Sequence, residues 1–179
     1  MKVVVINGKG GCGKDTFVSM CYKLLNQNQT KCCLCYNLST VDLVKEAAAV
    51  CGWAGEKDPA SRKFLSQLKD ILTEWKDLPF QDVVERTLRI QHKTEISGCV
   101  DDAIVFIHCR EPHEIQRLVD ELGARSLLIR RAAAESVEQC NHADNGVLDY
   151  EYDFTIDNNG TLDQLKEKAK AFLSVIFAD

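Results

Sequence analysis

A glycine-rich segment near the beginning of the chain constrains the fold more than any other feature. It runs G-K-G-G-C-G-K from Gly8 to Lys14 and matches the pattern G-x-x-x-x-G-K. The β-branched run before it, residues 2–6, is typical of a strand that is buried on both faces. Residues 15–26 after it carry apolar side chains at helical spacing. A strand, a glycine loop and a helix in this order predict a phosphate-binding loop, whereas a turn that merely joins strand and helix would leave its glycines and lysines without a role.

Each part of this loop has a chemical role in binding phosphate. Glycines let backbone N–H groups converge on phosphate oxygens, and the helix N-terminus adds positive partial charge. We expect Lys14 to reach the β- and γ-phosphates of a nucleotide. The next position, normally Ser or Thr, holds Asp15, which either binds Mg²⁺ or only caps the helix, and Thr16 is a second candidate ligand. The predicted nucleotide-binding residues are Gly8, Lys9, Gly10, Gly11, Cys12, Gly13, Lys14, Asp15 and Thr16.

Strands and helices alternate along the rest of the chain. Further strands are predicted at 31–36, 101–109, 126–129 and 152–156, and further helices at 40–50, 61–75, 79–93, 112–123 and 161–177. This alternation indicates one α/β domain, residues 1–179, with a mostly parallel sheet. Residues 40–97 are too long for a simple crossover, so we expect them to form a helical substructure beside the site.

Composition excludes several classes of protein. The net charge of −5 disfavours nonspecific binding to nucleic acid or to an anionic membrane. No apolar run approaches the ~20 residues of a membrane span, and the N-terminus does not resemble a signal peptide, so we expect a cytoplasmic protein. Nine cysteines, an odd number, argue against a disulfide framework. Cys32, Cys33 and Cys35 are interpreted as small apolar residues of a buried strand, with a metal or redox role as the alternative.

The string G-K-G-G-C-G-K-D-T-F resembles the phosphate loop of the P-loop nucleoside-monophosphate kinases. It is most similar to the branch with phage deoxynucleoside-monophosphate kinases and animal phosphomevalonate kinases, and looser similarities lie at 37–46, 104–115 and 149–165. The resemblance implies a three-layer P-loop fold with about five parallel strands, a helical acceptor-binding arm at 40–97 and a short lid at 130–147. It also implies transfer of a phosphoryl group from ATP, with Mg²⁺, to a small phosphorylated acceptor, of which a (deoxy)nucleoside monophosphate is the class most expected. The protein would act as a monomer or a homodimer on the small-molecule acceptor.

The resemblance also implies which residues outside the loop take part. Lys14, Arg130 and Arg131 are the catalytic candidates, and Thr40, Asp42, Arg62 and Arg110 are the acceptor-binding candidates. Arginine suits both tasks because its planar group meets phosphate in two places. The chain departs from the pattern at the end of the third strand, where many P-loop enzymes place an Asp for Mg²⁺. Here His108 holds that place, and Glu111 follows three residues later.

Two other functions fit the loop. K-G-G-C-G-K also matches the partitioning and septum-site ATPases, in which the first lysine, here Lys9, reaches across a dimer. Those proteins generally have Ser or Thr where this chain has Asp15. The second alternative is a kinase-like protein that binds nucleotide but transfers phosphate poorly, and His108 in place of an Asp favours it.

Overall fold

The computed structural model describes residues 1–27, 32–98, 100, 102–136 and 146–178. Within these ranges the strands are β1 (Lys2–Asn7), β2 (Cys33–Ser39), β3 (Asp102–His108), β4 (Arg125–Arg130) and β5 (Phe154–Asp157). They form one parallel sheet in the order β2-β3-β1-β4-β5, so β1 lies at its centre. The helices are α1 (Lys14–Asn26), α2 (Asp42–Val50), α3 (Pro59–Lys76), α4 (Leu78–Ser97), α5 (Pro112–Leu122), α6 (Ala132–Glu135) and α7 (Leu162–Ile176).

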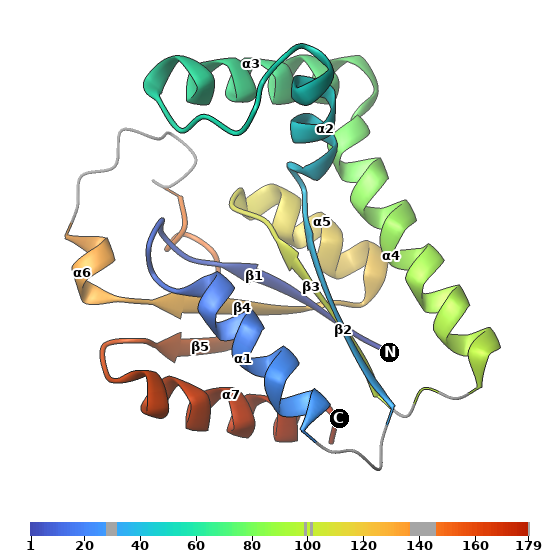
Figure 1. Ribbon diagram of the computed structural model, residues 1–179, viewed down its shortest axis with the longest axis vertical. Helices are drawn as coiled ribbons and strands as arrows, with labels where there is room; N and C mark the ends of the chain where they lie inside the picture. The colour runs from blue at the N-terminus through green and yellow to red at the C-terminus, as the bar shows by residue number, and fades with distance from the viewer. Residues whose placement is uncertain (28–31, 99, 101, 137–145, 179) are drawn as a thin grey trace.

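Alternate residues of the central strands build two hydrophobic cores, one on each face of the sheet. Val4 and Ile6 of β1 point to the core that α1 and α7 cover, where Phe17 and Phe172 meet edge to face with ring centroids 5.6 Å apart. Val3 and Val5 point to the core that α4 and α5 cover. This period of two follows from the pleat of a strand. The result is a three-layer α/β fold with five parallel strands, as expected (Figure 1).

The segment 40–97 forms a helical substructure, as expected, from α2, α3 and α4. Figure 1 shows α2 and α3 beyond one end of the sheet, whereas α4 runs back along it. Asp58 caps α3 by accepting hydrogen bonds from the N–H groups of Ala60 (2.9 Å) and Ser61 (3.0 Å). Asp77 reverses the chain between α3 and α4 in a left-handed conformation, with φ of 53°. None of the residues of α3 is fully buried.

Several predicted boundaries are wrong by two or three residues. The second strand extends to Ser39, because it stays paired with β3 as far as His108, and exposed Cys32 lies outside it. The helix predicted at 40–50 begins only at Asp42, and its N-cap is Val41, without a capping side-chain hydrogen bond. The last helix, predicted at 161–177, has Thr161 as its N-cap, and Gln164 completes a capping box.

The predicted lid at 130–147 is described only in part. It begins with Arg130 at the end of β4 and continues into α6. Residues 137–145 lie outside the described residues. Among the helices that the structure describes, none has the length and apolar character to cross a bilayer.

Candidate functional site

The glycine-rich loop leaves the central strand β1 and enters α1 directly. Gly8 and Gly13 have φ angles of 146° and 100°, a backbone region that side chains rarely adopt. A Cβ atom on Gly8 would lie 2.3 Å from the carbonyl oxygen of Ile129, and one on Gly13 would lie 2.4 Å from Nδ2 of Asn158. The loop therefore needs glycine at both positions for its conformation and for its close packing.

Two asparagines fix the ends of the loop. Asn7 Oδ1 accepts a hydrogen bond from the N–H of Gly8 at 2.7 Å, and Asn158 Nδ2 donates to the carbonyl of Cys12 at 2.8 Å. Lys14 Nζ donates to the carbonyl oxygens of Gly8 and, at 3.2 Å, of Lys9. The ammonium group of Lys14 is thus held against the backbone of the loop itself.

A cavity of about 530 Å³ opens beside the loop, at the carboxyl ends of the central strands. Gly10, Gly11, Lys14 and Asp15 form the side of the cavity that belongs to the loop. All four acceptor-binding candidates also line it, namely Thr40, Asp42, Arg62 and Arg110. Asp42 is fixed by accepting a hydrogen bond from the N–H of Ser39 at 2.7 Å. The structure thus brings the loop and the helical arm together around one space.

The other predicted site residues do not line this cavity. Gly8, Lys9, Cys12 and Gly13 belong to the loop but not to the wall, and exposed Thr16 lies outside the wall as well. Arg130 and Arg131 are also absent from the wall.

The Arg130 guanidinium group binds Glu135 instead, with Nε 2.9 Å and Nη2 3.1 Å from its carboxylate oxygens. Lys9 Nζ donates to the carbonyl of the same Glu135 at 3.4 Å. Arg131 is the N-cap residue of α6. Both arginines therefore lie at the start of α6, outside the cavity.

His108 ends β3 on the cavity wall and is the least satisfied polar side chain there. Its Nε2 atom is enclosed and has no hydrogen-bond partner in the part of the chain that the structure describes. Burial lowers the pKa of His108 to about 4, so its imidazole is neutral at neutral pH. A buried polar atom without a partner costs about 1–3 kcal/mol, so this atom stands out from the rest of the molecule.

Among the residues of the cavity wall that sequence reasoning missed, Lys69 of α3 has the strongest contacts. Its Nζ atom lies 2.6 Å from Glu111 Oε1 and 2.9 Å from Glu114 Oε1, which links the arm to the start of α5. Burial alone would lower the pKa of Lys69. The carboxylates of Glu114 and Glu111 have the larger combined effect, and the pKa of the lysine is raised. A signal was present, because Arg62, Ser66 and Lys69 recur at helical spacing and share the cavity-facing side of α3.

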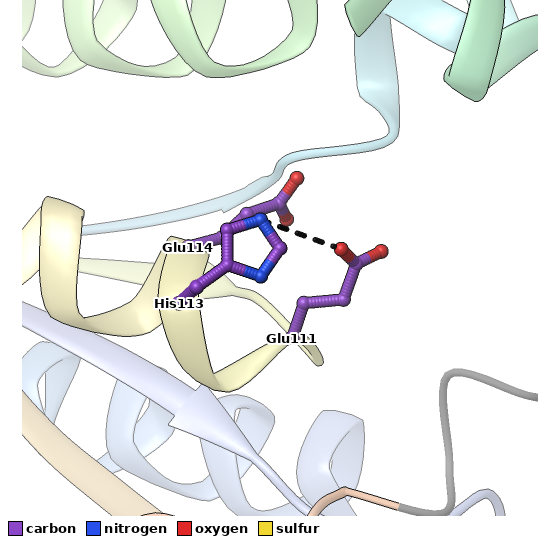
Figure 2. A group of neighbouring side chains, drawn as sticks. All are labelled: Glu111, His113 and Glu114. Carbon is purple, nitrogen blue, oxygen red and sulfur yellow. Dashed lines mark ion pairs between the residues drawn. The ribbon is translucent and has the colours of Figure 1, made fainter.

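Figure 2 shows a second group at the start of α5, formed by Glu111, His113 and Glu114. Their potential ligand atoms lie within 4.8 Å of one another, and His113 Nε2 is 3.8 Å from Glu111 Oε2. Such a group is compatible with a metal ion. The ammonium of Lys69 already bridges both carboxylates, however, so we assign the cluster to docking of the arm.

No family model and no curated protein sequence matches this chain. Solved structures similar to it include the APS kinase CysC of Mycobacterium tuberculosis in complex with AMPPNP and APS, at 13% identity and a TM-score of 0.47, covering 97% of each chain. A sugar kinase from a Janibacter species has 15% identity and a TM-score of 0.44, covering 97% of this chain and 95% of the other. TT1252 from Thermus thermophilus has 17% identity and a TM-score of 0.42, covering 97% and 96%. Likeness at this level does not assign a substrate, so function is inferred from the site itself.

Proposed function

We propose that this protein transfers the γ-phosphoryl group of ATP to a small phosphorylated acceptor, with a (deoxy)nucleoside monophosphate as the acceptor class. One observation carries the proposal: a single cavity joins the glycine-rich loop to Arg62 of the arm and to Arg110 in the loop after β3. Phosphoryl transfer depends on positioning and on cations around the phosphates rather than on covalent catalysis. A phosphate loop on one wall and arginines on the other meet that requirement.

The donor would bind at the loop and the acceptor at the arm. Gly10, Gly11 and Lys14 would hold the ATP phosphates through N–H groups and an ammonium. Arg62 and Arg110 would hold the acceptor phosphate, because guanidinium groups meet phosphate in two places. Asp15 offers an exposed carboxylate on the same wall, an oxygen ligand suited to the predicted Mg²⁺, which would shield the phosphate charges.

Arg130 and Arg131 would contact the transferred phosphoryl group only when the predicted lid closes over the bound substrates. They would therefore contribute to the transfer step more than to the binding of ATP. The start of α6 lies beside the glycine-rich loop, because Lys9 of the loop and Arg130 both donate hydrogen bonds to Glu135. Arg130→Ala and Arg131→Ala should then lower the rate of transfer far more than they weaken ATP binding.

The test is ADP formation with ATP and Mg²⁺ over a panel of ribonucleoside and deoxynucleoside monophosphates and non-nucleotide phosphates. Lys14→Ala should reduce the acceptor-dependent rate by ~10²–10³-fold, because it removes a charge that stabilises the transferring phosphate. Lys23→Ala, on an exposed position of the same helix, is the matched control. Arg62→Ala should raise the KM for the acceptor, whereas Lys63→Ala, next to it but off the cavity wall, should not.

Other outcomes would favour the alternatives. ATP binding without any acceptor-dependent ADP would indicate a binding protein. Hydrolysis that rises with protein concentration and depends on Lys9 would indicate a dimeric ATPase switch. In this structure Lys9 Nζ contacts Glu135 of its own chain.

A further inference from the structure

The enclosed Nε2 atom of His108 points to a ligand that the protein itself does not supply. It lies at the carboxyl end of β3, next to Ile6 at the end of the neighbouring β1. Within the described residues, it is the one buried side-chain nitrogen or oxygen atom without a hydrogen-bond partner. Buried polar atoms in folded proteins are nearly always paired, so an unpaired nitrogen on a cavity wall calls for a specific explanation.

The carboxylate of Asp15 lies close to this nitrogen. Its Oδ1 atom lies 3.8 Å from His108 Nε2, and its side chain is 93% exposed. This separation is too long for a hydrogen bond. Metal–nitrogen and metal–oxygen bonds of ~2.1 Å each can together span about 4.2 Å, so one cation can contact both atoms. Asp15 also follows Lys14 directly, which places the pair beside the phosphate loop.

We propose that His108 Nε2 and the Asp15 carboxylate together bind the divalent cation that accompanies the nucleotide, giving a site with one nitrogen and one oxygen ligand. The inference rests on the proposed function, because nucleotide phosphates would complete the ligand set. A carboxylate suits both magnesium and manganese, but magnesium prefers oxygen ligands alone, whereas transition metals of the first row also accept an imidazole nitrogen. The site therefore prefers a nitrogen-accepting cation such as Mn²⁺ or Co²⁺ over Mg²⁺.

The decisive measurement is pulsed electron paramagnetic resonance of Mn²⁺ bound to the full chain with a non-hydrolysable ATP analogue. Wild-type protein should show modulation from a directly bound ¹⁴N nucleus. His108→Asn should lose it, and His113→Asn, an exposed histidine on α5, should keep it. A spectrum of wild-type protein with oxygen ligands alone would overturn the inference without any variant.

Metal affinity gives an independent readout. With the analogue bound, His108→Asp exchanges a nitrogen ligand for oxygen and should lower the Mn²⁺ to Mg²⁺ affinity ratio at least ~10-fold. An unchanged ratio would overturn the inference. If ADP forms from ATP and acceptor while Mn²⁺ has only oxygen ligands, the inference fails and the proposed function stands. If the protein binds no nucleotide analogue, the proposed function fails and the inference fails with it.

Discussion

At the start of the phosphate loop, Gly8 has a backbone conformation and a neighbourhood that both exclude a side chain. Its positive φ costs another residue ~1–3 kcal/mol, and the clash with the Ile129 carbonyl adds a similar amount. Gly8→Ala should therefore lower the free energy of unfolding by about 2–6 kcal/mol in urea titrations. Gly55 has a φ of 101° but open space around it, so Gly55→Ala measures the cost of the backbone conformation without a clash. This variant should lose less unfolding free energy than Gly8→Ala. Equal losses in both variants would contradict the close packing of the loop on β4.

His108 should make the protein sensitive to mild acid. Burial holds its folded pKa at about 4, against 6.5 unfolded, while Asp15 and Asp42 favour its charged form and Lys14 and Lys45 oppose it. Between these values the unfolded state binds more protons, so stability is complete above pH 6.5 and falls as the pH drops toward 4. At ~1.4 kcal/mol for each pKa unit, the free energy of unfolding should fall by about 3 kcal/mol over this pH range.

Urea denaturation of the metal-free protein at pH 7 and pH 4.5 measures this loss. His108→Asn should remove most of the difference between the two pH values, and His113→Asn should leave it unchanged. An identical pH dependence in wild-type protein and His108→Asn would show that other groups cause it.

Individual residues differ in how far the sequence predicts them. Thr40, Asp42, Arg62 and Arg110 all reach the cavity because each stands near the end of a strand or the start of an arm helix, which chain order reveals. The isolation of the His108 nitrogen depends on everything that packs around the ring. No local pattern contains that information.

Among the elements, α3 has a single charged link to the start of α5, through Lys69. The Lys69 side chain is 15% exposed and that of Glu114 is 5% exposed, so Lys69→Ala leaves a buried carboxylate without compensation. Breaking such a pair costs about 3–5 kcal/mol of unfolding free energy. We expect a loss near the lower end, because Glu111 is partly exposed and water can solvate its carboxylate when Lys69 is removed.

The unfolding free energies of Lys69→Ala and Lys63→Ala test this link, since Lys63 is an exposed position on the same helix. Adding Glu114→Gln to Lys69→Ala should recover part of the loss, because it removes the unpaired charge. No recovery, or equal losses in both lysine variants, would contradict a docking role for Lys69.

Element boundaries were less predictable than element types. The loop, β1 and α1 follow from a motif with a strand before it and an amphipathic helix after it. β2 continues three residues beyond its apolar run because hydrogen bonding to β3 extends it to Ser39. A polar strand end like Asn37–Ser39 is formed by its neighbour and leaves no apolar signal.

For the molecule as a whole, we expect nine free thiols that differ widely in reactivity. Cys32 and Cys51 are exposed, whereas Cys12, Cys21 and Cys109 are buried, and burial raises the pKa of each buried thiol. Alkylation of native protein, mapped by mass spectrometry, should label Cys32 and Cys51 long before the buried three. Denatured, unreduced protein should give about nine reactive groups. Fewer groups, or labelling of Cys12 as fast as Cys51, would contradict this expectation.

The overall architecture was predictable because strand and helix alternate so regularly. The layer arrangement follows from that alternation together with the rule for right-handed crossovers. The relation of the arm to the sheet was not predictable in the same way. It depends on contacts such as Lys69 with Glu114, which join residues 45 positions apart.

The hydrogen bond from Asn158 to Cys12 joins residues separated by 146 positions. A chain that is still being synthesised contains the glycine loop long before it contains the residue that fixes it. Nascent chains that end before the turn after β5 should therefore bind nucleotide poorly, and ribosome-bound chains of increasing length would show binding appear only near completion. ATP would then reach a protein whose core is already assembled, and would act on the finished molecule rather than guide its folding.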